Sequence, residues 1–347
     1  MLDRRTLLAA TAAAPLAGAA LTSTAAEAAP RRGKVLARGL EVPWGMGFLP
    51  NGNALVTERM SGDVHVVRRS GGRRRIANVA GVEAAGEGGL LGLALSPTFR
   101  KDRWVYLYLS TGSDNRIVRM RYVDGRLRRR QQVLAGIPVN TTHNGGRIAF
   151  GPDGLLYAGT GDAGDAGLSQ DKSSYAGKIL RMTPTGEVPD GNPFGNHVWS
   201  FGHRNVQGLA WSGDGRMWAS ELGQNTRDEL NQIRKGRDYG WPDVEGGDGP
   251  GPFADPYVTW PTSACSPSGI AVARGRVWVA ALRGRSLWSV GIRKGNERRK
   301  KRWFHEDFGR IRTVERAPDG ALWIATSNRD GRGTPAKADD RVIRIVL

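Results

Sequence analysis

A histidine and an aspartate bracket one short apolar segment in the middle of the chain. His143 lies in THNGGRIAFGPDG, and Asp162 ends the following LLYAGTGD. An imidazole can act as a general base near neutral pH, and a nearby carboxylate would fix its tautomer and favour its protonated form. If a hairpin returns Asp162 toward His143, the spacing predicts a catalytic pair. The same spacing is equally compatible with a histidine in a loop and an aspartate that forms a turn, neither of which has a catalytic role.

A second polar cluster precedes the next apolar segment. It reads SFGHRNVQGLAW and contains His203, Arg204 and Asn205. These residues stand before their segment as His143 stands before its own, which predicts that both clusters meet at one opening. The alternative is a structural role in which Arg204 pairs with a neighbouring acid.

Three arginines nearer the C-terminus add positive charge to this set. Arg283 follows one apolar segment, and Arg310 and Arg312 lie in GRIRT before another. Alternation along a strand would place Arg310 and Arg312 on one face. Their guanidinium groups would then form a fork for a planar ligand with several negative charges. Because arginine is common in this chain, the pair alone indicates little.

Acidic residues and the single cysteine point to less specific chemistry. Glu221, Asp228 and Glu229 lie in a stretch whose oxygens suit a hard cation such as calcium, although it has no EF-hand spacing. Cys265 is the only cysteine, so no intramolecular disulfide can form. The surrounding SACSPSG offers no obvious partner for a catalytic thiol.

The elements that must position these residues are six copies of one phrase: an apolar residue, a tight turn and a run of alternating aliphatic and aromatic residues. The turn residues are Pro50, Pro97, Pro152, Gly213, Arg274 and Pro318. Their spacing of roughly 45 to 60 residues is in the range of propeller blades with some long loops. Glycine in the turns and alternation after them indicate strands. The sequence therefore predicts an all-β, six-bladed β-propeller in which residues 34–347 form one domain.

The first thirty residues differ from the rest. Arg4 and Arg5 precede an alanine-rich apolar run, and Ala26, Glu27 and Ala28 offer a small-residue cleavage site. We expect residues 1–28 to be an export signal, of the twin-arginine type. The alternatives are a membrane anchor and a disordered tail.

The export signal predicts a mature protein in the extracellular, periplasmic or cell-wall space. No later segment has the roughly 20 apolar residues of a transmembrane helix. The only helix expected after the signal is a short one near Ser173 to Ile179.

The net charge of +18 is large for 347 residues. The excess is concentrated in residues 68–75, 126–130 and 293–302, which lie between the repeated segments and are expected to be solvated hairpins. These runs contain almost no aromatic residues, which argues against specific nucleic-acid binding. Affinity for anionic cell-wall or membrane surfaces remains open.

Taken together, five phrases resemble the glucose/sorbosone dehydrogenases, a family of six-bladed quinoproteins that includes soluble PQQ-dependent aldose sugar dehydrogenases. The phrases are EGGLLGLALSP, THNGGRIAFGPDGLLYAGTGD, GKILRMTPTGEVPDGNPF, SFGHRNVQGLAW and DELNQIRKGRDYGWP. They occur in the family's order, and the resemblance covers essentially residues 34–347. GHRN and YGWP are its most specific parts.

The resemblance implies a role for each matching residue. His143 would be the general base that takes the proton of the sugar C1 hydroxyl while hydride passes to C5 of PQQ, and Asp162 would support it. A larger set would contact the cofactor: Arg204, Asn205, Trp260, Arg283, Arg310 and Arg312. Arg204 would lie near the reactive carbonyl oxygen, Trp260 would stack, and Arg283 stands where the family has a lysine.

The resemblance also implies a calcium ion bound by the main-chain carbonyls of Gly223 and Gln224. Gln224 replaces a proline of the best-known members, Leu222 replaces a glutamine, and Glu87 stands where glucose-oxidising relatives carry glutamine, at the substrate. The implied partners are an aldose and an external electron acceptor, with a monomer or homodimer as the assembly. Two alternatives stay open: a calcium-dependent propeller lactonase or hydrolase, and a noncatalytic carbohydrate-binding propeller.

Overall fold

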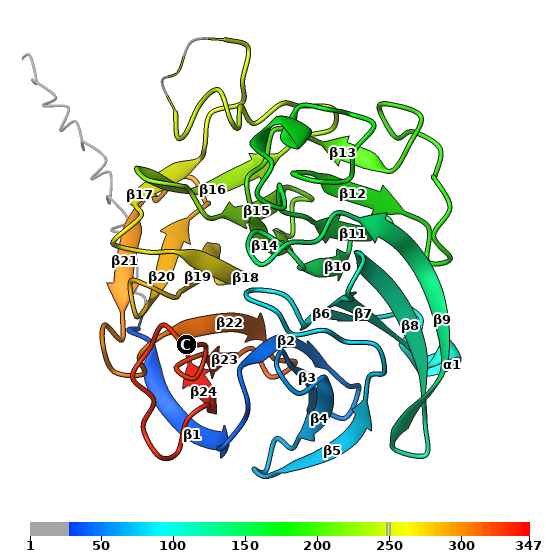
Figure 1. The fold of residues 1–347 in the computed structure, drawn as a ribbon. Helices are drawn as coiled ribbons and strands as arrows, with labels where there is room; N and C mark the ends of the chain where they lie inside the picture. Colours follow the sequence, from blue (N-terminus) through cyan, green and yellow to red (C-terminus); the bar gives the residue numbers. More distant parts are fainter. Residues whose placement is uncertain (1–27, 248, 250) are drawn as a thin grey trace, which may run out of the picture.

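Six four-stranded antiparallel sheets form a ring (Figure 1) in the computed structural model of the protein, which describes residues 28–247, 249 and 251–347. The first blade contains β2 (Pro43–Phe48), β3 (Ala54–Glu58), β4 (Asp63–Val67) and β5 (Arg73–Asn78). The second contains β6 (Leu90–Leu95), β7 (Trp104–Ser110), β8 (Asn115–Val123) and β9 (Arg126–Ile137). The third contains β10 (Ile148–Phe150), β11 (Leu156–Gly159), β12 (Ile179–Met182) and β13 (Val198–Ser200).

The other three blades complete the ring. The fourth contains β14 (Val206–Trp211), β15 (Met217–Glu221), β16 (Arg227–Ile233) and β17 (Val258–Pro261). The fifth contains β18 (Pro267–Ala273), β19 (Arg276–Ala281), β20 (Ser286–Gly291) and β21 (Lys300–Trp303). The sixth contains β22 (Ile311–Arg316), β23 (Leu322–Thr326), β24 (Val342–Val346) and β1 (Arg31–Ala37). In every blade the strand named first above lies nearest the axis (Figure 1). In the sixth blade this strand is β22, although β1 comes earlier in the chain.

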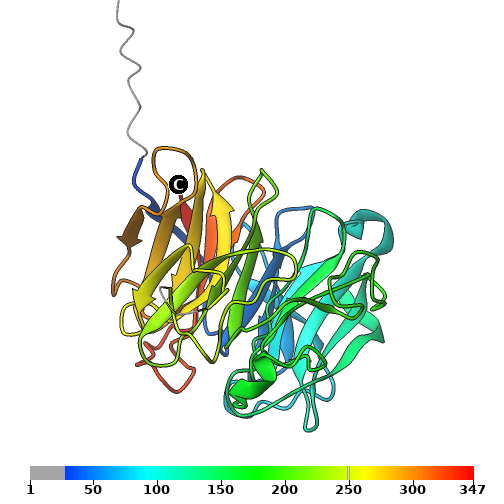
Figure 2. The same ribbon diagram turned by 90° about the horizontal axis from the view of Figure 1, so that it is seen from above.

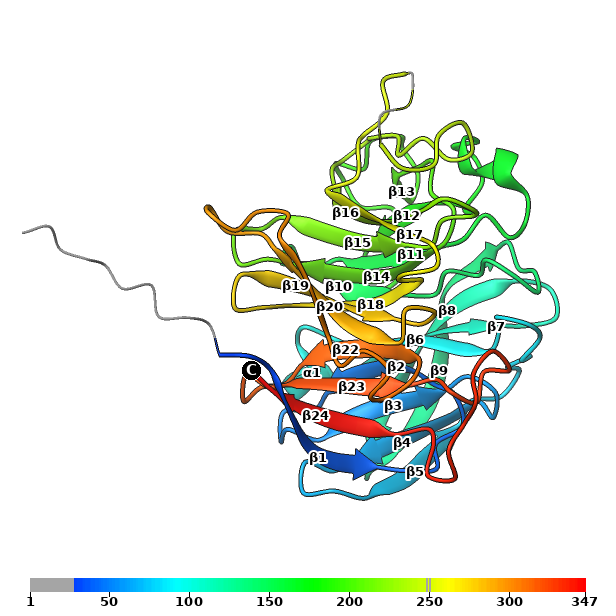
Figure 3. The same ribbon diagram turned by 90° about the vertical axis from the view of Figure 1, so that its left-hand side faces the viewer.

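The sixth blade closes the ring with strands from both ends of the described chain. β1 pairs antiparallel with β24, with Arg31 opposite Val346, and the two strands run side by side in Figure 3. The predicted six-bladed, all-β propeller is therefore confirmed. Each repeated phrase spans the hairpin between the two innermost strands of one blade.

The third hairpin shows why the phrase folds this way. Gly154 has a φ of +76°, a conformation that costs glycine little because it has no Cβ. Asp153 accepts a hydrogen bond from the backbone N–H of Leu155 through Oδ1 at 3.1 Å. The turn then returns the chain so that Phe150 pairs with Leu156.

The hydrophobic core consists of six clusters between neighbouring blades. In the largest, Tyr106 and Tyr108 of the second blade pack with Leu156 and Leu180 of the third, and all four are buried. Each large apolar side chain buried in this way contributes roughly 1.5–3 kcal/mol. Packing between blades thus stabilises a fold that has no disulfide.

The predicted helix near Ser173 to Ile179 is wrong. The backbone N–H groups of Ser173 and Ser174 donate to Asp171 in a local turn. Gly177 donates across the loop to the carbonyl of Gly161 at 2.8 Å, and β12 begins at Ile179. The helices of the described chain are α1 (Phe99–Asp102) and the 3₁₀ helix η1 (Ala166–Ser169). They lie on opposite sides of the ring (Figure 2).

The two sides of the ring differ in what they carry. We call the side where innermost strands begin, which carries η1 and faces the viewer in Figure 1, the front face. The opposite side, which carries α1 and the turns of the repeated phrase, is the back face.

The predicted export signal, residues 1–28, lies almost entirely outside the described residues and stays a prediction. Within the part of the chain that the structure describes, we find no helix long and apolar enough to cross a membrane.

Candidate active site

His143 and Asp162 meet on the front face. His143 lies in the loop before β10 and Asp162 in the loop after β11. The imidazole Nδ1 and the Asp162 Oδ1 are 2.7 Å apart, and the side chains are 18% and 2% exposed. The hairpin thus returns the carboxylate to the imidazole, as the sequence predicted for this pair.

The backbone around the pair is fitted closely. His143 has a φ of +54°, an uncommon conformation for a residue with a side chain. Its carbonyl packs so near Gly161 that a Cβ there would lie 1.8 Å from the oxygen. Glycine at 161 therefore allows the histidine loop to approach the end of β11.

Trp241 completes the pair and was not identified from the sequence. Its indole Nε1 donates a hydrogen bond to Asp162 Oδ2 at 2.9 Å, and the Arg204 guanidinium lies over the ring, 5.5 Å from its centre. The tryptophan comes from the YGWP phrase, between β16 and β17. That phrase was the available signal, but it sits in a long loop whose path the spacing does not predict.

Asp162 is held in its charged form. Burial raises the pKa of this carboxyl, but hydrogen bonds from His143, Gly164 and Trp241 together with the charge of His143 lower it more, so the net pKa lies below its ordinary value. A charged carboxylate next to Nδ1 favours a proton on that nitrogen. Nε2 is then the nitrogen free to accept a proton.

Arg204 approaches the same place from the next blade. Its Nη1 donates to the carbonyls of Leu222 at 3.1 Å and Gly223 at 2.9 Å. Burial lowers the pKa of Arg204, while the charges of Asp162, Glu221 and other carboxylates oppose that shift. Its Nε is buried without a hydrogen-bond partner among the described residues.

His203, by contrast, is a structural residue. Its Nδ1 lies 2.9 Å from Glu221 Oε2 and its Nε2 lies 2.9 Å from Ser200 Oγ. Its ring stacks on Tyr239, and the side chain is completely buried. Glu221 also accepts a hydrogen bond from the backbone N–H of Arg204. This set of groups resembles a serine hydrolase triad, but a buried serine cannot reach a substrate.

Asn205 joins the two clusters. It is buried, and its Oδ1 accepts a hydrogen bond from the backbone N–H of Gly145 at 3.0 Å. Its backbone also forms a bridge with Gly161. The amide therefore ties the loop that carries His143 to the loop that carries Arg204.

Arg310 and Arg312 lie together at the start of β22, around one carboxylate. Arg310 Nη2 is 2.8 Å and Arg312 Nη2 is 3.4 Å from Asp330 Oδ2. Arg312 also donates through Nη1 to Gln207 Oε1 at 2.8 Å. Burial lowers the pKa of Arg312 to about 9, and the charges of Arg59 and Arg310 add to that shift.

Arg59 is a further cation that was not identified from the sequence. It follows β3 as Asp162 follows β11, and this equivalent position in its blade was the available signal. It is 5% exposed. Like the Nε of Arg204 and Arg312, its Nε is buried without a partner among the described residues. Such a cluster of three guanidinium groups, each with a buried Nε that has no partner among the described residues, suits a ligand with several negative charges.

Glu87 links the histidine to these arginines. Its Oε2 accepts a hydrogen bond from the backbone N–H of His143 at 3.1 Å, and its Oε1 lies 3.1 Å from Arg332 Nη1. Its charge also acts on Arg59, Arg204 and Arg312. The structure thus brings His143 and the arginines of three other blades to one opening.

The loop after β15 holds Gly223 and Gln224 in a fixed conformation. Glu245 Oε1 accepts hydrogen bonds from four successive backbone N–H groups, 224–227, at 2.6–3.2 Å. The N–H of Gly223 donates to Asp228 Oδ1 at 3.1 Å. The carbonyl of Gly223 is a hard oxygen ligand of the kind that calcium prefers, but here it accepts the hydrogen bond from Arg204.

The three acidic residues proposed for a cation do not converge. Glu221 pairs with His203, and Asp228 accepts from the N–H groups of Gly223 and Ser266. Burial raises the pKa of Asp228 to about 7. Glu229 accepts from Asn231 and Gly246. Among the described residues, one group of three side chains is close enough to ligate a metal ion together, namely Glu58, Asp63 and His65. The Arg73 guanidinium contacts His65, so a positive charge already lies at this group.

Trp260 does not reach the site, so its predicted stacking on a cofactor is wrong for this structure. It lies on the outermost strand β17, is 1% exposed and packs in the core with Trp288. Arg283 is exposed in the loop after β19, and its side chain makes no hydrogen bond or ion pair with the described residues. Cys265 is buried, which raises the pKa of its thiol and makes it unreactive.

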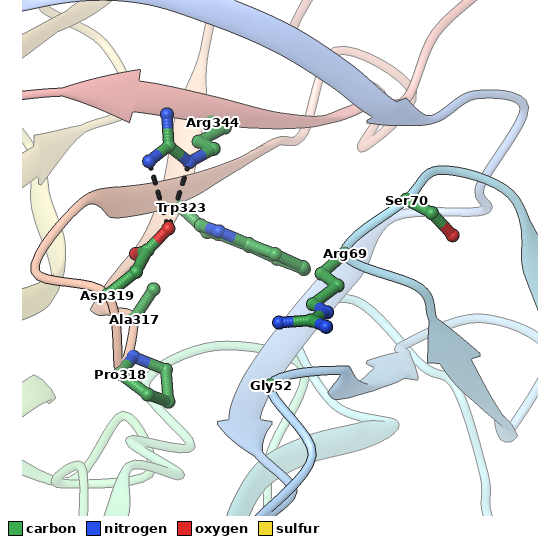
Figure 4. Close-up of a pocket in the computed structure, with 8 residues that line it drawn as sticks. All are labelled: Gly52, Arg69, Ser70, Ala317, Pro318, Asp319, Trp323 and Arg344. Carbon is green, nitrogen blue, oxygen red and sulfur yellow. Dashed lines mark hydrogen bonds and ion pairs between the residues drawn. The ribbon is translucent and has the colours of Figure 1, made fainter.

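An apolar cavity lies elsewhere. It has a volume of about 390 Å³ and lies on the back face between the first and sixth blades, beside Trp323 (Figure 4). Arg344 pairs with Asp319 at 2.9 Å along its wall. Its lining contains no histidine, so the base chemistry of the front face has no counterpart here.

Comparison with known proteins agrees with this geometry. The family model for glucose/sorbosone dehydrogenase matches residues 40–334. The chain belongs to the glucose/sorbosone dehydrogenase family. The resemblance of the five sequence phrases is thereby confirmed, and the chain is an oxidoreductase of this family.

Individual relatives span most of the chain. The aldose sugar dehydrogenase YliI of Escherichia coli is 29% identical over 86% of this chain and 90% of its own length. Quinoprotein glucose dehydrogenase B of Acinetobacter calcoaceticus is 32% identical over 61% of this chain and 52% of its own length. The PQQ-bound structure of aldose sugar dehydrogenase from Streptomyces coelicolor is 49% identical, covers 91% of this chain and 97% of its own, and has a TM-score of 0.88.

Proposed function

We propose that this protein oxidises aldose sugars at C1 to the lactone with PQQ as its cofactor. The observation that supports this most directly is the His143–Asp162 pair at an opening that also gathers buried arginines with unused donors. Family membership and the likeness to a PQQ-bound aldose sugar dehydrogenase support the same reaction.

In this proposal His143 is the general base. Asp162 accepts a hydrogen bond from Nδ1–H, so Nε2 carries the lone pair and would take the proton of the sugar C1 hydroxyl. The carboxylate then stabilises the imidazolium that forms. Glu87 holds the backbone of His143 and faces the substrate side of the opening.

When bound, PQQ would supply the hydride acceptor. Arg59, Arg204 and Arg312 would hold its oxygens through the positive charge of their guanidinium groups. Arg310 and Asn205 would fix the two sides of the binding site, and Arg283 would add an outer cation. A positive charge that is already in place costs no reorganisation when negative charge develops.

Calcium is proposed at the main-chain carbonyls of Gly223 and Gln224. Bound there, it would supply positive charge beside the reacting oxygen. Arg204 donates to the Gly223 carbonyl, and two cations on one carbonyl repel each other. Metal binding would therefore require this hydrogen bond to be released, which frees Arg204 for the cofactor.

The reaction leaves two electrons on the protein with each turnover, so an external electron acceptor must remove them. We also infer that residues 1–28 direct export, which would place this exchange outside the cytoplasmic membrane. Whether the enzyme acts as a monomer or a homodimer is decided by the same preparation, through its mass in solution.

Reconstitution tests the proposal. The purified protein is mixed with calcium and PQQ, a panel of mono- and disaccharides is added, and the absorbance of the cofactor is followed with an artificial electron acceptor as a second readout. We expect reduction by aldoses only when both PQQ and calcium are present. Binding of sugar without reduction would support the carbohydrate-binding alternative, and lactone hydrolysis without PQQ would support the hydrolase.

A further inference from the structure

The outermost strands of four blades carry exposed basic residues and no acidic ones. There are three on β1, three on β5, four on β9 and three on β21, and all thirteen side chains are exposed. We call this set the basic rim. Its members are Arg31, Arg32, Lys34, Arg73, Arg74, Arg75, Arg126, Arg128, Arg129, Arg130, Lys300, Lys301 and Arg302.

The basic rim is continuous from blade to blade. The fifth, sixth, first and second blades are neighbours in the ring (Figure 1). Lys301 of the fifth blade and Pro30, next to β1, line one cavity. Lys34 of β1 donates to the carbonyl of Ser70 in the first blade, and Arg74 donates to the carbonyl of Gly125 in the second at 3.2 Å.

The charges of the rim are largely unpaired. Arg75 lies 3.3 Å from Asp63, and Arg73 lies 3.8 Å from Glu58. The other eleven make no ion pair with an acidic residue of the described chain. Thus the mutual repulsion of these cations is not relieved within the protein, and an external polyanion would relieve it.

Protection of strand edges does not account for the pattern. Charged residues on an edge strand prevent pairing with other chains, which would favour them on every blade. β17 and β21 are both four residues long, yet β21 has three basic residues and β17 has none. β13 of the third blade has none either. Exposed basic residues on outermost strands are therefore confined to one continuous arc of the ring.

We propose that the basic rim binds long-chain inorganic polyphosphate, a flexible linear phosphate polymer. A flexible chain can follow a curved wall that spans four blades, whereas a flat membrane touches a convex wall at one part only. Ten of the thirteen residues are arginine, whose fork suits phosphate oxygens. Binding at the rim leaves the front face open to substrate.

Two variants with the same change in charge test this proposal. The rim variant carries Arg31→Glu, Arg126→Glu, Arg128→Glu and Lys301→Glu. The control variant carries Lys172→Glu, Arg234→Glu, Lys235→Glu and Lys337→Glu, which are equally exposed but lie off the rim. Binding of fluorescently labelled long-chain inorganic polyphosphate is measured by anisotropy at several salt concentrations, after thermal melting has shown that both variants fold.

We expect the rim variant to bind polyphosphate at least tenfold more weakly than the wild type, and the control variant less than threefold more weakly. With about 0.7 units of salt slope per phosphate contact, losing four contacts should lower the slope of log Kd against log salt by about 3. Equal weakening in both variants would mean that only net charge matters and would overturn the proposal. So would binding to anionic lipid vesicles, or to duplex DNA, without binding to polyphosphate.

Discussion

The third and fourth blades each place a histidine beside a carboxylate, and the two pairs differ in exposure and in role. His143 and Asp162 are 19 residues apart and 2.7 Å apart, and His203 and Glu221 are 18 residues apart and 2.9 Å apart. In both, Nδ1 faces the carboxylate. The side chain of His143 is 18% exposed, whereas that of His203 is fully buried.

The other ring nitrogen makes the difference. Nε2 of His203 lies 2.9 Å from Ser200 Oγ, whereas Nε2 of His143 makes no hydrogen bond with the described residues. One imidazole therefore has both nitrogens engaged and holds the backbone of Arg204 in place through Glu221. The other has one free nitrogen at the opening. A histidine–carboxylate pair is thus a possible base only if its second nitrogen is free.

The largest expected effect comes from removing the free imidazole. In His143→Ala, kcat should fall about 10³-fold, because general-base catalysis contributes 10²–10⁴-fold, while PQQ binding and the melting temperature persist. His143→Asn is the matched control for the backbone, since asparagine tolerates a positive φ, and it should lose the same activity. Full turnover in either variant would remove the base assignment.

Removing the buried imidazole of His203 should lower the stability of the fold. In His203→Ala, Glu221 stays buried without its partner, which should lower the free energy of unfolding by about 3 kcal/mol in urea denaturation. Adding Glu221→Gln should recover part of this loss, because the unpaired charge is gone. If His203→Ala unfolds like the wild type but turns over 10³-fold more slowly, the two histidines do not differ as described.

Asp162→Asn removes the charge of the carboxylate but leaves the imidazole of His143 in place. We expect kcat to fall about 10²-fold, since the amide neither fixes the tautomer nor stabilises the imidazolium. The folded-state pKa of Asp162 is lowered, so its stabilising effect is present above the ordinary carboxyl pKa and is lost as the pH falls through the folded-state pKa. Stability measured from pH 6 to pH 2 should decline less in Asp162→Asn than in the wild type.

The smallest effect is expected at Ser200. Ser200→Ala leaves His203 Nε2 buried without its partner, which should cost about 1–2 kcal/mol in the free energy of unfolding. Turnover per folded molecule should stay unchanged. A large loss of lactonase activity would instead show that the buried serine is a nucleophile.

Much of the fold could be predicted from the sequence because the repeated motif of each blade is made of residues that are close together in the chain. In the third, fourth and sixth blades a turn with glycine after aspartate, followed by alternating apolar residues, predicts the inner hairpin without knowledge of the other blades. His143, Asp162, Arg204, Arg310 and Arg312 were found because they flank these hairpins, where the ring must bring them together.

Other parts depend on packing that the pattern does not contain. Trp241 enters the site from a long loop between outer strands, and Trp260, in a similar loop-flanking position, turns into the core instead. Arg59 follows its inner hairpin as Asp162 does, but only the closed ring shows that it lies close to Arg312. The segment at Ser173 was expected to be helical, but its first N–H groups form a local turn with Asp171 and Gly177 pairs across the loop with Gly161, near Asp162.

The pairing of β1 with β24 has a consequence for how the enzyme is made. The sixth blade is complete only when β24 has paired with β1, so a fragment that lacks either strand lacks a complete blade. Contacts between residues so distant in sequence form slowly, since the intervening chain must be ordered first. Arg310 and Arg312 belong to the blade that is completed in this final step. We therefore expect the site of these two arginines to form late in folding, when the two ends of the described chain pair.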